Sequence, residues 1–240
     1  MSLVHPLDDV LYPPFGGFPK RGIEFLKKLK RNNNRPWFQR HKEEYEMNVR
    51  FPMQCLIATL AGKLRDEIPE FEFHPRRSIF RIYRDVRFSK NKAPYKTNIA
   101  ASLQPRGAPA GIEFPGLYVG IEPGEIFVGG GLYLPSSAQL KAIRRTIVDQ
   151  PDEFLAIVED RRFKKRFGSI LGEKLQKAPL GFAKDHPLID YLRYKQFYVG
   201  VEWDDESPCY SKKFADTVAA IFLDSVPFIR WLMKATASSV

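Results

Sequence analysis

The chain has 240 residues, of which 44% are hydrophobic and 13% aromatic, so its apolar surface is sufficient for a substantial core and argues against a long disordered segment. Its net charge of +10 favours anionic partners, and no apolar run reaches the roughly 18 residues that a membrane-spanning helix needs. The N-terminus lacks a basic start followed by an apolar run, so we expect a cytoplasmic protein without a membrane partner.

The N-terminal third of the sequence has the periodicity of helices. Apolar residues recur at helical spacing over 23–29 and stop at a run of asparagines, the last of which, Asn34, is a suitable cap for the next helix. The apolar stripe continues over 37–49, and it resumes over 56–64 after an expected kink at Pro52. We therefore predict that this region is helical.

The periodicity changes at residue 80. Apolar residues alternate with charged or polar ones over 80–88, which is typical of a half-buried strand, and 99–103 is a second candidate strand. Two prolines and two glycines make 104–113 a predicted loop. The strands 117–122 and 125–132 flank Pro-Gly, an order that suits a tight hairpin turn.

The predicted hairpin register places its aliphatic side chains on one face. On the other face, Phe127 lies opposite Gly120 and Tyr118 lies opposite Gly129, so each ring is expected to cover a glycine. This gives the glycine run 129–131 a structural role. Binding of a phosphate there would need a helix N-terminus directly after the run, and the sequence does not have one.

The C-terminal half contains further helix and strand signals. The predicted elements are a helix from Ser136 or Ser137 to Asp149, a helix that begins at Pro151, a strand over 197–203, and a helix over 211–225 that Pro227 interrupts. Helices first, a mostly antiparallel sheet with a Pro-Gly hairpin in the middle and helices last make an α+β fold. We expect one domain over 18–234, with an N-terminal extension (1–17) and a C-terminal tail (235–240).

The positive charge is concentrated in two places. Residues 76–106 contain nine Lys or Arg and one acid, Asp85, which gives a net charge of +8. Residues 161–166 add five more basic side chains. Both clusters favour anionic partners, although the second is equally consistent with ordinary surface charge that keeps a protein soluble.

Arg84 does not fit the predicted strand. Strict alternation over 80–88 places it on the apolar face, where a charge must be paired or must bind an anion. The alternative is a bulge that turns Arg84 outward. Asp85 lies in phase with Arg81 and Arg87, so we expect its carboxylate to be held ionised by these arginines in a structural role, not to serve as a general base.

The segment 89–97 follows directly and carries three lysines, two hydroxyl side chains and one tyrosine. Arginine binds oxyanions through paired hydrogen bonds, lysine adds charge, and a tyrosine ring can stack on a base or sugar. The segment is not a Walker motif, because no glycine-rich turn precedes its lysines, and a solvated loop is the alternative. The predicted anion-binding residues are Arg81, Arg84, Arg87, Ser89, Lys90, Lys92, Tyr95, Lys96 and Thr97.

Several motifs of the chain resemble those of domain-of-unknown-function family 2461. They are Asn32-Asn33-Asn34-Arg35-Pro36-Trp37-Phe38, the run from Phe80 to Lys90, Pro94-Tyr95-Lys96-Thr97, the run from Phe127 to Gly131, and Asp185-His186-Pro187. The resemblance extends from about Phe18 to Leu232, and its central motif is long enough to be specific. It implies a single-domain protein, and it assigns no catalytic residues, because the family has no established activity.

Other chemistries lack their sequence signals. The scattered histidines and the two cysteines have no metal-ligand or CxxC spacing, so we expect reduced thiols, no metal and no cofactor. His41 and His186 are candidate acids or bases, but packing or capping is the commoner role for such residues. Cys209 lies among acids, which disfavours a reactive thiolate, and no nucleophile elbow is present.

These observations lead to three functional hypotheses. The first is a pocket in which the basic strand and loop bind a phosphorylated small molecule or nucleotide. The second is a nucleic-acid-binding protein that uses the same basic residues, with Tyr83 and Tyr95 as stacking rings. The third is a protein-interaction module. The sequence predicts neither a reaction nor an oligomeric state.

Overall fold

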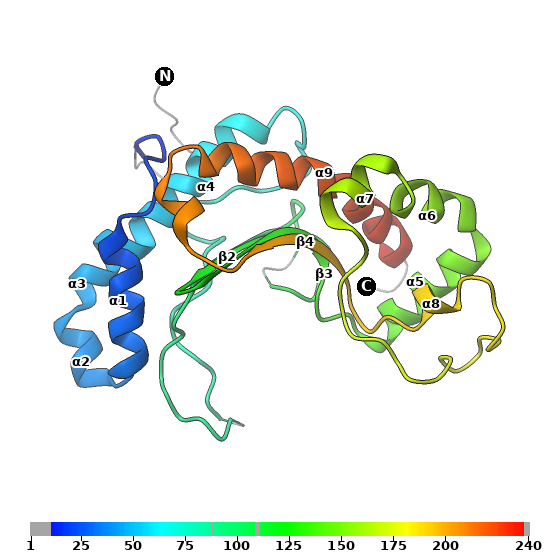
Figure 1. Ribbon diagram of the computed structural model, residues 1–240, viewed down its shortest axis with the longest axis horizontal. Coiled ribbons are helices and arrows are strands. Elements are labelled where there is room, and N and C mark those ends of the chain that lie inside the picture. Colours follow the sequence, from blue (N-terminus) through cyan, green and yellow to red (C-terminus); the bar gives the residue numbers. More distant parts are fainter. Residues whose placement is uncertain (1–10, 88, 109–110, 238–240) are drawn as a thin grey trace. The chain divides into compact units, whose positions relative to one another are not determined.

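The computed structural model describes residues 11–87, 89–108 and 111–237 and has the predicted α+β architecture, with helices first, a four-stranded antiparallel sheet in the middle and helices last (Figure 1). The described residues form two compact units. Unit 1 contains the residues up to Arg106, Tyr118–Val128 and Glu202–Ala220, and unit 2 contains Gly107–Leu117, Gly129–Val201 and the residues from Ile221 onward. None of the helices in the described ranges combines the length and the hydropathy that a membrane crossing requires.

Unit 1 begins with the predicted helical region. Its segments are α1 (Lys20–Arg31), α2 (Arg35–Arg40), α3 (Lys42–Tyr45), the π-helix η1 (Glu46–Arg50) and α4 (Phe51–Leu64). Asn34 caps α2 as predicted, because its side chain accepts a hydrogen bond of 3.0 Å from the Trp37 N–H. Pro52 lies in the first turn of α4, and the kink expected there is instead a π-helical turn directly before α4.

The sheet has the strand order β1-β2-β3-β4, so strands that follow each other in sequence are neighbours. The strands are β1 (Ile99–Leu103), β2 (Gly116–Glu122), β3 (Glu125–Leu132) and β4 (Phe197–Trp203). Gly124 in the turn between β2 and β3 has a φ of 90°, a conformation that favours glycine and confirms the predicted Pro-Gly hairpin. The aliphatic side chains predicted to share one face are fully buried.

The structure gives Gly129 a further structural role that the sequence did not indicate. A Cβ atom at Gly129 would overlap the backbone oxygen of Val199, so the backbone of β4 requires glycine at this position. The predicted cover of Gly129 by Tyr118 stays a prediction. The Tyr118 ring lies over Gly120 of its own strand, where a Cβ atom would come within 2.7 Å of the phenol oxygen.

The predicted strand over 80–88, of which residue 88 lies outside the described ranges, does not form. The chain is extended there, but it makes only an isolated bridge, between Tyr83 and Tyr95. The Arg84 N–H donates a 2.9 Å hydrogen bond to the Pro94 carbonyl, and Pro94 has no N–H with which to continue a ladder. The alternating pattern thus reflects an extended segment without a strand's hydrogen-bond ladder.

The remaining helices follow most of the predicted signals. They are α5 (Ser137–Asp149), α6 (Pro151–Val158), α7 (Arg161–Phe167), α8 (Ile189–Leu192), the 3₁₀-helix η2 (Ser207–Tyr210) and α9 (Phe214–Thr236). Ser136 caps α5 in a capping box with Gln139, which confirms the predicted start. The predicted interruption at Pro227 is wrong, because α9 continues through it. Pro227 and Leu223, whose carbonyl loses its helical partner, are both exposed, so water can solvate that carbonyl.

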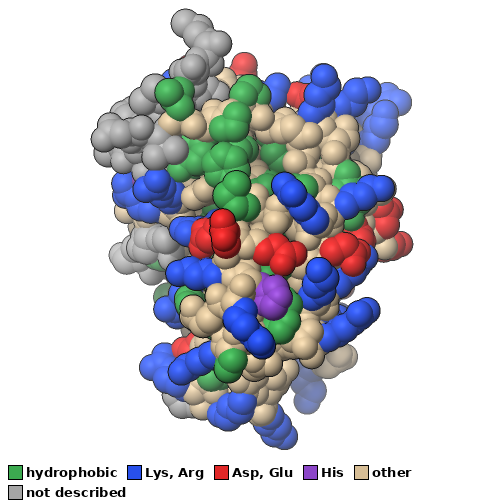
Figure 2. All heavy atoms as spheres, turned by 90° about the vertical axis from the view of Figure 1, so that its left-hand side faces the viewer, with side chains coloured by type: hydrophobic (Ala, Val, Ile, Leu, Met, Phe, Trp, Pro, Cys, Tyr) green, Lys and Arg blue, Asp and Glu red, His purple; other side chains and the backbone are tan. Residues whose placement is uncertain are grey.

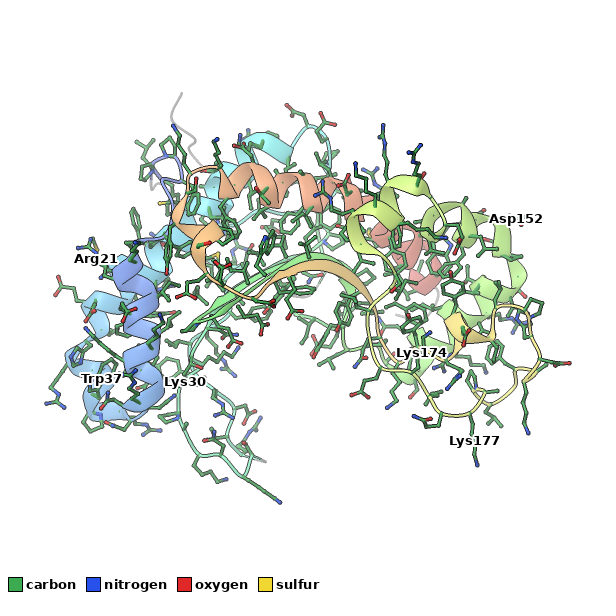
Figure 3. All side chains as sticks on the ribbon, in the orientation of Figure 1. Arg21, Lys30, Trp37, Asp152, Lys174 and Lys177 are labelled. Carbon is green, nitrogen blue, oxygen red and sulfur yellow. The ribbon has the colours of Figure 1, made fainter. Side chains whose placement is uncertain are left out.

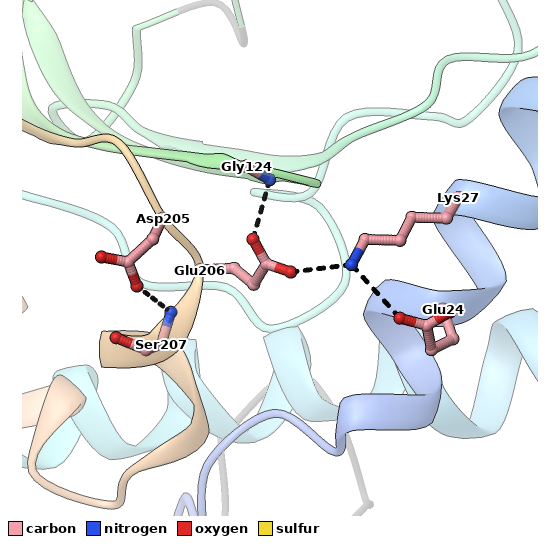
Figure 4. A network of polar contacts seen from close by, with 6 residues as sticks. All are labelled: Glu24, Lys27, Gly124, Asp205, Glu206 and Ser207. Atoms are coloured by element: carbon pink, nitrogen blue, oxygen red, sulfur yellow. Dashed lines mark hydrogen bonds and ion pairs between the residues drawn. The ribbon is translucent and has the colours of Figure 1, made fainter.

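One carboxylate of unit 1 links α1 to the tip of the hairpin (Figure 4). Glu206 accepts a 2.9 Å hydrogen bond from the Gly124 N–H and a 3.0 Å hydrogen bond from the Lys27 ammonium. Lys27 also lies 3.2 Å from Glu24. The Lys27 contact and the Gly124 N–H lower the pKa of Glu206, although its burial acts in the opposite direction.

We expect the Glu206→Gln variant to lose about 1 kcal/mol of stability at neutral pH, because glutamine replaces a charge-assisted acceptor by a neutral one. A carboxylate with a lowered pKa stabilises the fold fully above its unfolded-state pKa of about 4.3 and loses this contribution as the pH falls through the folded-state value. Urea denaturation of both proteins at neutral and acidic pH should therefore show a difference that shrinks below about pH 4. A difference that is independent of pH would contradict this role of Glu206.

Candidate functional site

The basic segment, residues 81–97, is attached to the N-terminal helices of unit 1 through Tyr95. The Asn33 side chain donates a 3.0 Å hydrogen bond to the Tyr95 carbonyl and accepts one of 3.0 Å from the Tyr95 N–H. The Tyr95 ring stacks on Phe38, with 4.1 Å between centroids and 24° between planes. Two motifs that are far apart in the sequence, one at the start of α2 and one in the basic segment, therefore meet.

Tyr95 is consequently a core residue. Only 1% of its surface is exposed, so the prediction that its ring stacks on a ligand is wrong. Its burial raises its pKa, and the nearby Arg35 acts in the opposite direction. Sequence reasoning missed Asn33 and Phe38 as supports of the segment and Arg35 as a further cation beside it. Both 32–38 and 94–97 are motifs that resemble the same family, and this was the sequence signal that could have indicated their contact.

Arg84 is half-buried, and its guanidinium lies 3.5 Å from the Ser89 hydroxyl. Arg84, which did not fit the predicted strand, is therefore neither fully buried nor fully exposed to solvent. Within the described ranges Arg84 forms no ion pair with a carboxylate. A guanidinium and a hydroxyl that meet without a carboxylate can both donate hydrogen bonds to an oxyanion.

Asp85 and Arg87 neutralise each other. The Arg87 guanidinium donates to both carboxylate oxygens, at 3.0 Å for Nε and Oδ1 and at 2.7 Å for Nη2 and Oδ2. The Arg87 N–H also donates to Oδ1 at 3.1 Å. These contacts lower the pKa of Asp85 to about 2, so the predicted structural pairing of Asp85 with Arg87 is confirmed. Arg87 is therefore less available to a ligand than the other cations of the segment.

The lysines of the basic segment have different surroundings. The Lys96 ammonium lies 5.0 Å from the centroid of the Phe80 ring, and its pKa is lowered first by burial and then by the charge of Arg81. Lys92 donates a 3.0 Å hydrogen bond to the Val86 carbonyl. Lys90 and Arg81 are exposed, and Thr97 is half-buried. Within the segment, Arg84 thus lies beside Ser89, and the charge of Arg81 acts on the Lys96 ammonium.

The second basic cluster lies on α7 of unit 2. Lys164 pairs with Glu159, and Arg166 lies 2.6 Å from Asp224. The exposed positions of Arg161, Arg162 and Lys165 agree with surface charge.

The histidines and cysteines have structural surroundings. The Nδ1 atom of His186 accepts a 3.1 Å hydrogen bond from the Leu188 N–H in the turn before α8, whose N-cap is Leu188, so His186 does not cap the helix. Cys55 and Cys209 are free and buried, and burial raises their pKa values to about 11 and about 12. Neither thiol forms a thiolate readily. In the described part of the chain, no group of three or more His, Cys, Asp or Glu residues is arranged to hold a metal ion.

The comparison with known families gives one match. The family described as conserved hypothetical protein (DUF2461) matches residues 21–231, which is nearly the whole chain and agrees with the resemblance of the motifs. No curated protein and no solved structure matches the chain.

Proposed function

The chain belongs to the DUF2461 family of conserved hypothetical proteins, whose description names no activity, and from its basic segment we propose that it binds a phosphate-bearing small molecule or nucleotide. The observation that carries this proposal is the half-buried Arg84 guanidinium beside the Ser89 hydroxyl, with no carboxylate partner in the described ranges. A partly desolvated cation without a counter-ion is unfavourable, so a bound oxyanion would supply the missing partner.

The surrounding charges support the same ligand class. Arg81, Lys90 and Lys96 add positive charge within the same short segment, and Asp85, its one acid, is already paired with Arg87. A field of one sign raises the local concentration of anions and speeds their association. The proposal is limited to binding and includes no reaction step. Phosphorylated metabolites and nucleotides are intracellular ligands, and the proposal retains the cytoplasmic location expected from the sequence.

The surroundings of the two tyrosines favour a compact ligand over a nucleic-acid strand. Single-stranded nucleic acids bind through successive bases stacked on exposed aromatic rings. The Tyr95 ring is buried against Phe38, whereas Tyr83 is 49% exposed, so one ring of the proposed stacking pair is unavailable. A phosphate held by Arg84 and Ser89 needs no stacking platform.

Thermal denaturation with inorganic phosphate, pyrophosphate and adenosine triphosphate tests the proposal. Binding to the native state raises the melting temperature, so we expect at least one of these anions to stabilise the wild type. The Arg84→Gln variant should bind about 10- to 100-fold more weakly, because it loses a charge-assisted hydrogen bond. Arg162→Gln, which removes one exposed cation from α7, should respond like the wild type.

Two outcomes would count against the proposal. The first is the absence of any shift in the wild type at high millimolar anion, and the second is an identical response of the wild type and Arg84→Gln. Stabilisation by oligonucleotides of many sequences, lost steeply with added salt, would favour the nucleic-acid alternative instead.

A further inference from the structure

One face of the hairpin formed by β2 and β3 carries aromatic side chains, although the solvated face of an antiparallel sheet is usually polar. The rings of Phe80, Tyr118 and Phe127 form an aromatic row on this face, with 6.3 Å between the first two centroids and 6.1 Å between the last two. All three residues are half-buried, so each retains solvent-accessible surface. The buried aliphatic side chains of the hairpin occupy the opposite face, and Figure 3 shows side chains on both faces of the sheet.

The backbone holds the aromatic row in place. The Phe80 N–H donates a 3.0 Å hydrogen bond to the Ala100 carbonyl of β1, and the other two rings stand on strands that pair with each other. The Tyr118 ring also rests over Gly120, where any larger residue would displace it. Rings that are already fixed lose little conformational freedom when a planar group stacks on them, so the row is suited to binding a nucleobase.

Two cations lie at the Phe80 end of the row. The Lys96 ammonium is 5.0 Å from the Phe80 centroid, and the charge of Arg81 acts on it. Within the described ranges, neither cation forms an ion pair, and a half-buried ammonium without a carboxylate favours a bound anion. The side of the molecule to which α1 to α3 belong is different, because acidic and basic side chains together surround a histidine there (Figure 2).

The same end of the row leads into the phosphate site proposed above. Phe80 and Arg84 are four positions apart in an extended segment, so their Cα atoms are at most about 14 Å apart. Lys96 lies along this path, because its N–H donates a 2.7 Å hydrogen bond to the carbonyl of Ile82, midway between them. The order of aromatic ring, ammonium and guanidinium fits a ligand with a planar ring at one end and phosphates at the other.

The hairpin tip at the other end of this face is acidic. Glu122 and Glu125 share the face of the aromatic row, because they are an even number of positions from its rings. The pKa of Glu125 is raised by burial and then by three nearby carboxylates, which belong to Glu122, Glu202 and Asp204. A nucleic-acid strand that continued along the face would bring its phosphates to these carboxylates, whereas a single nucleotide would not.

We propose that the ligand of the basic segment is a single nucleotide whose base stacks on the aromatic row. This inference rests on the phosphate binding proposed above and adds the part of the ligand that binds beyond the phosphates. The phosphate nearest the sugar faces Lys96 and Arg81, and the terminal phosphate reaches Arg84 and Ser89. Every base has a π-face, so the row distinguishes nucleotides from other phosphorylated compounds and not one base from another.

Isothermal titration of the full chain with pyrophosphate and with the diphosphates of adenosine, guanosine, cytidine and uridine tests the inference. At least one nucleotide should bind the wild type about 10-fold more tightly than pyrophosphate does. Tyr118→Leu and Phe127→Leu keep an apolar side chain but remove a ring of the row, so they should lose this preference and bind pyrophosphate as the wild type does. Tyr133→Leu removes an exposed ring of unit 2 and should keep the preference.

Equal binding of pyrophosphate and all four nucleotides, or ring variants that keep the wild-type preference, would overturn the inference without affecting the phosphate proposal. Binding of neither ligand class would overturn both proposals. Oligonucleotides that bind more tightly than nucleotides, with an affinity that falls steeply with added salt, would assign the row to a nucleic-acid strand and overturn the inference as well. The melting temperature shows whether each variant is folded, and if one ring variant is not, the other and the wild-type preference decide the outcome.

Discussion

Replacement of Tyr95 by alanine is expected to lower the free energy of unfolding by about 3–5 kcal/mol, the usual cost of removing a fully buried aromatic ring. The ring has 1% of its surface exposed and stacks on Phe38, so its loss leaves a cavity between α2 and the basic segment. Urea denaturation followed by tryptophan fluorescence measures the change. Because Tyr95 attaches the segment that carries Arg84, anion binding should weaken in the same variant.

Tyr95→Phe is the matched control for this variant. It keeps the ring and its stacking on Phe38 and removes only the hydroxyl, so we expect a loss within about 1 kcal/mol and unchanged anion binding. If Tyr95 were instead an exposed ring that contacts a ligand, Tyr95→Ala would change stability by less than about 0.5 kcal/mol. That result would contradict the placement of Tyr95 in the core.

Replacement of Gly22 by alanine is expected to destabilise unit 1 by about 2–3 kcal/mol, although alanine is the better helix former by about 1 kcal/mol. Gly22 lies in α1, and a Cβ atom there would overlap the backbone oxygen of Asn48 in the π-helical turn. Backbone cannot move aside as a flexible side chain can, so α1 and η1 must separate. The melting temperature and the urea midpoint should both fall.

Gly16→Ala provides the comparison for Gly22→Ala. A Cβ atom at Gly16 has no neighbour within 4 Å, so this change should leave stability within about 0.5 kcal/mol or raise it slightly. Equal effects of the two substitutions, or a stabilising effect of Gly22→Ala, would show that α1 does not contact the π-helical turn as closely as described.

Features with local causes could be predicted from the sequence. The Asn34 cap, the Ser136 capping box and the Pro-Gly turn each depend on residues within four positions of one another, and all three form. The α+β order followed from such signals together with the change of hydrophobic period. Pro227 is the exception among these local signals, because the predicted interruption does not occur. On the exposed side of α9, water can solvate the carbonyl that proline leaves unpaired.

The strand predicted over 80–88 does not form, and the alternation of apolar and polar residues could not indicate why. A period of two indicates an extended chain with two different faces, but a strand also needs a partner that can donate and accept hydrogen bonds. The facing segment contains Pro94, and the Asp85 side chain takes the Arg87 N–H. Extended conformation was therefore predictable, and the absence of a ladder was not.

The candidate site was predictable in composition but not in arrangement. The charge pattern identified Arg84 and its neighbours, and the pairing of Asp85 with Arg87 followed from their spacing. The burial of Tyr95 did not, because its support comes from Asn33, 62 positions away, and from Phe38. The π-helical turn η1 had no sequence signal, since it differs from an α-helix by one hydrogen-bond step.

Isothermal titration of inorganic pyrophosphate into the wild type and into Arg84→Gln tests most directly whether the basic segment binds a phosphate group. We expect saturable binding at one site in the wild type and about 10-fold or greater weakening in Arg84→Gln, while Arg162→Gln binds as the wild type does. Binding of equal strength in the wild type and Arg84→Gln, or no heat of binding in the wild type, would contradict it.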